Sequence, residues 1–182
     1  MSAADRNADI RALIRTIPDF PQPGVRFRDI TALLGNGPGF ALATARLADL
    51  ARPLNADLIA AIEARGFIFG AALAHMLGIG LLPVRKPGKL PGETVGVDYA
   101  LEYGTDRLEI HAADLAAGAR VLIVDDLIAT GGTAIATAEL VRGRGAVVAG
   151  ALFVVDLTDL GGAARLEAAG VPVSSLVEFE GD

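Results

Sequence analysis

The chain has 182 residues with a formal net charge of −6, and 52% of them are hydrophobic. This length and composition predict one domain over residues 1–182 with a real core, and they argue against intrinsic disorder. An acidic chain is unlike most nucleic-acid-binding proteins, which carry a basic domain. The absence of Cys excludes disulfides, thiolate nucleophiles and Cys-based zinc sites, and two His exclude a His-rich metal site.

The N-terminal third predicts two helices separated by an irregular segment. Ile and Leu residues recur at helical spacing over 4–16, which predicts an amphipathic helix without the apolar core of a signal peptide. Residues 17–27 hold three Pro and one Gly, so we expect irregular structure there. Pro38 is placed to open a second helix that runs to Leu50.

The stretch from 66 to 84 carries no Asp, Glu, Lys or Arg, and its length is close to that of a membrane span. It also contains four Gly and Pro83. We therefore predict a buried helix over 67–77, a turn, and a strand over 81–85, following a short apolar strand over 57–62.

The second half alternates strands and helices. Residues 86–94 form a Pro/Gly loop, and 95–104 with 107–111 alternate as an antiparallel excursion. Further on we expect strands over 119–125, 146–156 and 172–179, with helices over 132–142 and 162–169. This order predicts an α/β fold with a parallel β-sheet core flanked by helices. Ligands of such folds bind at the carboxyl ends of the strands.

One of these strand ends carries a chemical motif, "VLIVDDLIATGGTA", over residues 121–134. Small residues before a helix let an anion approach the free backbone N–H groups. The motif lacks the Lys of a P-loop and the spacing of a dinucleotide site. The carboxylates of Asp125 and Asp126 would repel a phosphate, but they suit sugar hydroxyls or hydrated magnesium. A ribose 5-phosphate fits both parts of the motif, with its hydroxyls at the two carboxylates and its phosphate at the small loop.

The motif resembles the phosphoribosyl pyrophosphate (PRPP) signature of the type I phosphoribosyltransferases. The segments "FPQPGVRFRDIT" (20–31), "ARGFIFG" (64–70), "RKPGKLPGET" (85–94) and "LEYGTDRLEIH" (101–111) further resemble the adenine phosphoribosyltransferase family. The likeness covers most of the chain from Ile17 onward. "NGPGF" (36–40) departs from the acidic-Pro pattern expected there, which affects a helix cap more than any chemistry.

The resemblance implies a purine salvage enzyme that forms AMP and pyrophosphate from adenine and PRPP. It implies magnesium carried with PRPP and a homodimer in the cytoplasm, with no nucleic-acid or membrane partner. It also implies a small hood from residues 1–35, and a mobile lid from 94–106 that would keep water from the reacting sugar.

The site residues follow in four groups. Asp125 and Asp126 would meet the ribose diol and, indirectly, the magnesium, while the 5-phosphate would lie on Ala129, Thr130, Gly131, Gly132 and Thr133. Pyrophosphate needs cations, and we expect them from Arg65, Arg85, Lys86 and Lys89, with Tyr103 nearby. Arg85 would serve a neighbouring subunit. Adenine would stack on Phe27, with Arg26 and Arg28 reading its edge through their backbone. Glu102 would accept the adenine proton. We expect the two His, His75 and His111, to be structural.

Alternatives stay open at this point. Phe27 could be a core anchor, Glu102 an exposed strand residue, and Lys86 part of a solvated loop. Another purine base, such as xanthine, hypoxanthine or guanine, could replace adenine. A non-catalytic PRPP-sensing regulator is a further alternative, although the chain shows no DNA-binding helical pattern.

Overall fold

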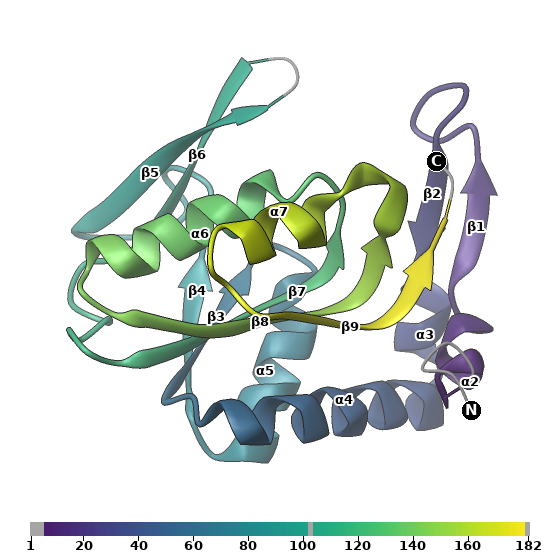
Figure 1. The fold of residues 1–182 in the computed structure, drawn as a ribbon, viewed down its shortest axis with the longest axis horizontal. Coiled ribbons are helices and arrows are strands. Elements are labelled where there is room, and N and C mark those ends of the chain that lie inside the picture. The colour runs from purple at the N-terminus through teal and green to yellow at the C-terminus, as the bar shows by residue number, and fades with distance from the viewer. Residues whose placement is uncertain (1–5, 102–103, 181–182) are drawn as a thin grey trace.

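A computed structural model describes residues 6–101 and 104–180. Its centre is a five-stranded sheet in the order β4-β3-β7-β8-β9, with every neighbouring pair parallel. Two antiparallel pairs, β1–β2 and β5–β6, stand at opposite sides of this sheet (Figure 1). The predicted α/β fold with a parallel core is confirmed.

The elements in chain order are α2 (Ala8–Arg11), β1 (Arg15–Pro18), β2 (Arg26–Asp29), α3 (Thr31–Gly35), α4 (Gly37–Ala51), η1 (Arg52–Leu54), β3 (Leu58–Ile62), α5 (Gly66–Leu77), β4 (Gly80–Val84), β5 (Thr94–Leu101), β6 (Gly104–His111), β7 (Arg120–Ile128), α6 (Gly132–Gly143), β8 (Val147–Leu157), η2 (Thr158–Leu160), α7 (Gly162–Ala168) and β9 (Val173–Phe179).

Helices cover both faces of the sheet, as the continuous apolar strands require. The core on one face joins α6 and α7 to the sheet, and the core on the other joins α2, α3, α4 and α5. The Gly-rich stretch after residue 66 forms α5 and β4 as predicted. Among the helices of the described residues, none combines the length and apolar character needed to cross a membrane.

The unusual "NGPGF" segment starts α4. The Asn36 side chain accepts a hydrogen bond from the Gly39 N–H at 2.8 Å, and Pro38 lies in the first turn. Asn is among the best N-cap residues and Pro suits this turn. Asn36 therefore supplies the cap at the point where the sequence departs from the expected acidic-Pro pattern.

The hood differs from the prediction. Among the described residues of the segment 4–16, where a helix was expected, Arg6 and α2 are helical, and Arg15–Pro18 forms β1. β1 pairs in antiparallel register with β2, which lies in the segment expected to be irregular. Ile10 and Ile14 are both buried, as the helical spacing suggests, but the chain leaves the helix after Arg11. The Arg15–Asp29 pairing holds the following residues in a strand instead.

The predicted antiparallel excursion is a hairpin of β5 and β6 that extends beyond the sheet (Figure 1). A bridge between Arg85 and Glu109 joins β6 to the chain after β4. Leu108 and Ile110 of β6 are buried in the core with α6. The base of the hairpin is therefore part of the globular body.

Candidate active site

Asp125 and Asp126 lie inside β7, not after it. The strand was expected to end at residue 125, but it pairs with β8 as far as Ile128. Successive strand residues point to opposite faces, so the two carboxyls have different surroundings. Asp125 lines a cavity of about 180 Å³ together with residues 127–134. Asp126 is almost fully buried, and its Oδ2 lies 2.9 Å from Nε of Arg65.

Burial raises the pKa of Asp125 well above its usual range, and the charge of Asp126 raises it further. Burial also raises the pKa of Asp126, while the charge of Arg65 opposes that shift. The contact with Arg65 is an ion pair without hydrogen-bond geometry, so Oδ2 of Asp126 accepts no hydrogen bond from any described residue. Ionising both carboxyls therefore costs free energy while no ligand is bound, as expected for groups that bind hydroxyls or a cation.

The predicted phosphate loop closes this cavity. Residues 129–133 line it as a set, and α6 begins at Gly132 as expected. No side chain caps the N-terminus of α6, and Gly131 has a φ of +81°. The first N–H groups of the helix are therefore available to an anion.

Two glycines that sequence reasoning did not single out shape the cavity. A Cβ on Gly162 would lie 2.2 Å from the carbonyl oxygen of Ala129 and 2.7 Å from the N of Gly131. A Cβ on Gly66 would lie 2.7 Å from Oδ1 of Asp125. The motifs "LGG" and "ARGF" contain these glycines, but their close contacts depend on segments far apart in the chain.

Arg65 connects the three expected subsites. Its guanidinium pairs with Asp126 and lies over the ring of Phe27, 5.5 Å from the ring centroid. Phe27 is half-buried in β2 and contacts Phe20 edge-on at 5.3 Å. The structure thus brings a pyrophosphate candidate, a ribose candidate and the adenine candidate together.

Arg28 and Arg26 flank Phe27 in β2. The Arg28 side chain is buried, donates to the carbonyl of Glu180 at 3.2 Å, and lies over the ring of Phe179. It also donates to the hydroxyl of Thr16. The Arg28 guanidinium therefore fastens the hood to the C-terminal segment, and the expected contact of its backbone with the base stays a prediction. Arg26 is exposed.

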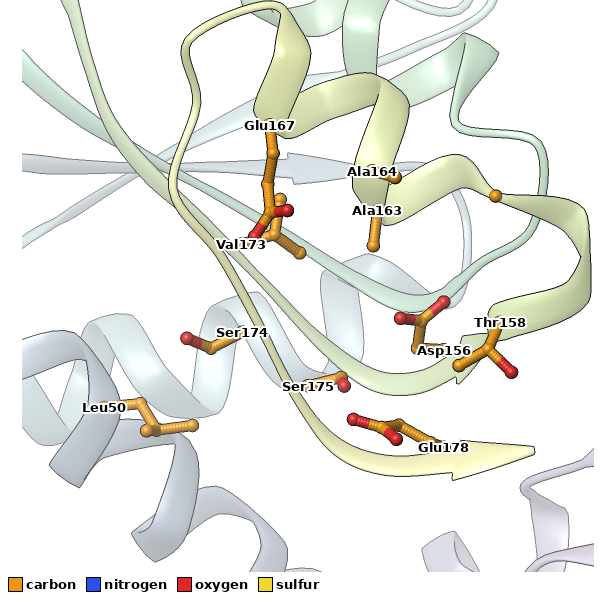
Figure 2. Close-up of a pocket in the computed structure, with 11 residues that line it drawn as sticks. Leu50, Asp156, Thr158, Ala163, Ala164, Glu167, Val173, Ser174, Ser175 and Glu178 are labelled. Atoms are coloured by element: carbon orange, nitrogen blue, oxygen red, sulfur yellow. The ribbon is translucent and has the colours of Figure 1, made fainter. Parts of the chain in front are cut away.

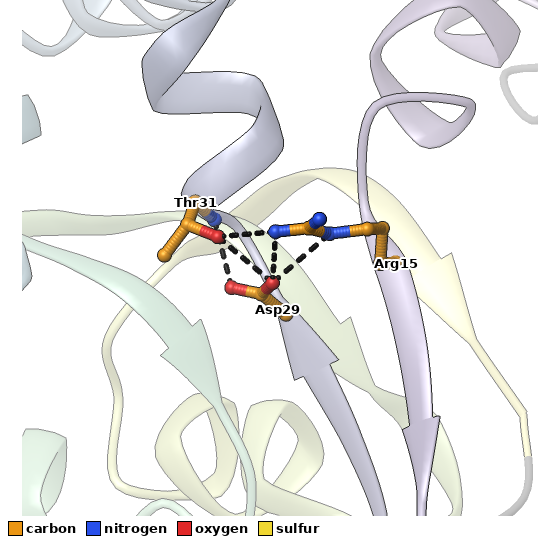
Figure 3. Close-up of polar contacts among 3 residues, drawn as sticks. All are labelled: Arg15, Asp29 and Thr31. Carbon is orange, nitrogen blue, oxygen red and sulfur yellow. Dashed lines mark hydrogen bonds and ion pairs between the residues drawn. The ribbon is translucent and has the colours of Figure 1, made fainter.

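A second polar network holds the hood, as Figure 3 shows. Asp29 accepts hydrogen bonds from the N–H and hydroxyl of Thr31 and from the guanidinium of Arg15, at 2.7–3.1 Å. The hydrogen bonds from Thr31 lower the pKa of Asp29 most, and the contact with Arg15 lowers it further. These contacts fix the end of β2, and with it the position of Phe27.

We expect Asp29→Asn to lower the free energy of unfolding by about 1–2 kcal/mol at neutral pH, because Thr31 and Arg15 lose a charged acceptor. A carboxyl with a lowered folded-state pKa stabilises the fold above its ordinary pKa and loses this effect as pH falls through the lowered value. The difference between variant and parent should therefore shrink below about pH 4. Urea unfolding at neutral pH and below about pH 4 measures this difference.

Asp49→Asn is the control. Asp49 forms an exposed ion pair with Arg52, and its substitution should change the free energy of unfolding by less than about 0.5 kcal/mol. Equal effects of the two variants would contradict the role of Asp29.

The other basic residues expected to bind pyrophosphate, Arg85, Lys86 and Lys89, lie in the loop after β4. Lys86 donates to the hydroxyl of Tyr99 at 3.1 Å and pairs with Asp106, so it is attached to the β5–β6 hairpin. Arg85 pairs with Glu63 at 2.9 Å and donates to the carbonyl of Lys89 at 3.0 Å. Lys89 itself is exposed. In this structure Arg85 and Lys86 are each neutralised by an acid of their own chain.

Glu102 and Tyr103 lie outside the described residues, so their predicted roles remain predictions. In the sequence they lie between the end of β5 at Leu101 and the start of β6 at Gly104.

Comparisons with known proteins identify the family of this chain. Residues 33–167 match the phosphoribosyl transferase domain family. The adenine phosphoribosyltransferase of Sphingopyxis alaskensis is 60% identical, over 96% of this chain and 95% of that protein. That of Erythrobacter litoralis is also 60% identical, over 95% of this chain and 97% of that protein.

Solved structures give the same result. A crystal structure of adenine phosphoribosyltransferase from Thermoanaerobacter pseudethanolicus has a TM-score of 0.90 and 50% identity, covering 95% of this chain and 99% of that one. The Saccharomyces cerevisiae enzyme, complexed with an imino-altritol bisphosphate and adenine, has a TM-score of 0.88 and 39% identity, covering 96% and 99%. The chain therefore belongs to the adenine phosphoribosyltransferase family.

Proposed function

We propose that this chain transfers the phosphoribosyl group of PRPP to adenine and forms AMP and pyrophosphate. The observation that carries this proposal is the position of Arg65 between Asp126 and Phe27. A transfer reaction needs the leaving group, the sugar and the incoming base around one carbon atom. Arg65 lies where candidates for all three meet, and the named relatives support adenine as the base.

PRPP would bind in two halves. Its 5-phosphate would lie in the cavity of residues 129–133, held by the N–H groups that open α6. Its ribose hydroxyls would donate hydrogen bonds to Asp125 and Asp126, whose pKa values are raised mainly by burial. Binding of these donors favours the ionised form of both groups.

Magnesium would come with the substrate. Within the described residues, no three His, Cys, Asp or Glu side chains gather into a metal site. The two carboxylates fit a hydrated ion held mainly by substrate oxygens, since Mg²⁺ keeps several waters and few protein ligands. Bound in this way, the ion would neutralise charge on the pyrophosphate.

The chemical step breaks the bond between the anomeric carbon and the pyrophosphate oxygen, which keeps the electron pair. Arg65 and Lys86 would receive this anion by exchanging their present acidic partners for phosphate oxygens. Lys89 and Tyr103 would add further contacts. A ring nitrogen of adenine, stacked on Phe27, forms the new bond, and Glu102 takes its proton. Carboxylates near the sugar would stabilise the positive charge that develops there.

The affinity for PRPP should rise with pH. Burial keeps Asp125 and Asp126 protonated to higher pH than an ordinary Asp, and the ionised carboxylates accept hydroxyl donors more strongly than the protonated carboxyls do. We expect PRPP binding, measured by calorimetry between about pH 5 and pH 8, to tighten until both groups are ionised. The ligand-free fold should lose stability over the same range, because the folded state binds more protons than the unfolded one. Asp125→Asn should flatten both curves, and unchanged curves would contradict this assignment.

A base-competition assay tests the function. Purified protein receives PRPP, magnesium and equal amounts of adenine, hypoxanthine, guanine and xanthine, and the nucleotide products are separated. We expect AMP as the dominant product. If a different nucleotide dominates, the substrate is another purine base and not adenine. If PRPP binds but no nucleotide forms, the non-catalytic PRPP-sensing regulator is favoured.

We also propose that the chain forms a homodimer. Ile68 and Met76 are large apolar residues on α5 that are 40% and 45% exposed, and α5 packs beside the edge strand β4. A second copy would cover such a patch. Sedimentation velocity should show a dimer that Met76→Glu weakens, and a monomeric parent would contradict the proposal. The cytoplasmic location stays a prediction.

A further inference from the structure

A second cavity, of about 550 Å³, lies between α7, the end of β8 and β9. It shares no lining residue with the cavity of the phosphate loop. Figure 2 shows Asp156 and Glu178 near each other and Glu167 further along, on α7. Its volume falls within the range of small-molecule sites. The proposed reaction uses none of these residues.

Asp156 is a buried carboxyl without a partner. It is 7% exposed, and its Oδ1 accepts no hydrogen bond from any described residue. Buried polar atoms are nearly always paired, so an unpaired carboxylate oxygen that lines a cavity requires an explanation. Its side chain borders the cavity directly.

The surroundings of Asp156 are negative. Asp156 in β8 and Glu178 in β9 are partners in the parallel register, so both point to the same face of the sheet. Burial raises the pKa of Asp156, and the charges of Glu178 and Glu167 raise it further. No basic residue occurs among the described residues that line the cavity. Like charges opposite each other destabilise a sheet, and a bound cation would remove this cost.

The lining is better suited to an organic cation than to a metal ion. The three acids do not gather into a metal site among the described residues. Ser174, Ser175 and Thr158 add hydroxyl oxygens that can accept hydrogen bonds. The Thr158 hydroxyl donates to the carbonyl of Phe179, which leaves its lone pairs available.

Apolar side chains separate the acids. Ala163 and Val173 line the space between Asp156 and Glu167, and Leu50 lines its far side. Methylene groups pack favourably on such walls, while ammonium groups need carboxylates and hydroxyls. The charged groups and the apolar walls together match a flexible chain that is cationic at both ends.

We propose that this cavity binds an aliphatic diamine or polyamine. One ammonium group pairs with Asp156 and Glu178, the methylene chain lies along Ala163 and Val173, and a second ammonium group reaches Glu167. The site is independent of the proposed transferase reaction, because it shares no residue with the active site.

Calorimetry with the full chain tests this at about 0.15 M ionic strength, where distant charges are screened. Putrescine and spermidine are the probes, and n-butylamine and Mg²⁺ are the comparison ligands. We expect one site per chain, with both probes binding more tightly than n-butylamine or Mg²⁺. Asp156→Asn and Glu178→Gln should each weaken binding about 10-fold or more.

Asp114→Asn is the matched control, since Asp114 is an exposed acid outside both cavities. Its affinity should stay within about twofold of the parent. Both pocket variants should fold like the parent. Asp156→Asn removes an unpaired buried charge and should not lower the unfolding temperature, and Glu178→Gln changes an exposed residue. Absence of binding to the parent, unchanged affinity in both pocket variants, or equal weakening by Asp114→Asn would each overturn the proposal. Tighter binding of Mg²⁺ than of the amines would overturn the assignment to an organic cation.

Discussion

Gly162→Ala is expected to lower kcat/KM for PRPP by about 100-fold, since displacements near 1 Å in an active site have effects of this size. The new Cβ would lie 2.2 Å from the carbonyl oxygen of Ala129 and 2.7 Å from the N of Gly131. Both atoms belong to the backbone of the phosphate loop, so no side chain can rotate away. The loop or α7 must move, and either movement changes the cavity that would hold the 5-phosphate.

The same substitution should destabilise the fold by about 1–3 kcal/mol, the usual cost of overpacking. A fall of about 2–4 °C in Tm for each kcal/mol is expected for a chain of this size. Steady-state kinetics with varied PRPP and a thermal unfolding curve measure both effects. KM for PRPP should change more than KM for adenine, because the contact lies behind the phosphate loop.

Gly143→Ala provides the control. Gly143 ends α6, and a Cβ there would meet no atom within 4 Å. The change should leave kinetics unaltered and stabilise the helix by up to about 1 kcal/mol. If Gly162→Ala keeps kcat/KM within about threefold of the parent, the phosphate loop does not need this close contact.

Asp126→Asn is expected to lower kcat/KM for PRPP by about 100-fold, because it weakens a charged hydrogen bond to the ribose and removes charge near the reacting carbon. The free energy of unfolding should stay equal or rise. Burial raises the pKa of Asp126, so its ionised form costs stability that a neutral amide does not.

Arg65 makes this variant informative about the pyrophosphate group as well. Arg65 is 44% exposed on its side chain and loses its ion pair with Asp126, so it becomes a cation that water can solvate. Product inhibition by pyrophosphate should therefore persist in Asp126→Asn. Glu139→Gln, an exposed residue of α6, is the control for the loss of one negative charge. Normal use of PRPP by a folded Asp126→Asn protein would contradict the proposed diol contact.

Local patterns in the sequence were enough to predict the core of the fold. Continuous apolar runs became β3, β7 and β8, and the helices between them began and ended within a few residues of the predicted bounds. The order of strand, two acids, small loop and helix also placed the small loop correctly before α6, where it lines a cavity. These features depend on neighbours in the chain, which a single sequence displays.

The hood could not be predicted in this way. Helical spacing in residues 4–16 predicted a helix, whereas Arg15 pairs with Asp29 and the chain becomes β1. The segment rich in Pro contains β2, because pairing with β1 gives it partners that its own composition does not suggest. Contacts between strands outweighed local propensity here.

The sequence by itself determined the parallel sheet, the acidic pair and the small loop, because periodicity, charge and glycine placement act over a few residues. Only the tertiary structure decided that Arg65 pairs with Asp126 beside Phe27, that Gly162 supports the phosphate loop, and that Asp156 lies unpaired in a second cavity. Each of these contacts joins segments separated by 30 residues or more in the chain, or depends on burial. Such contacts arise from the packing of whole elements, which no local pattern records.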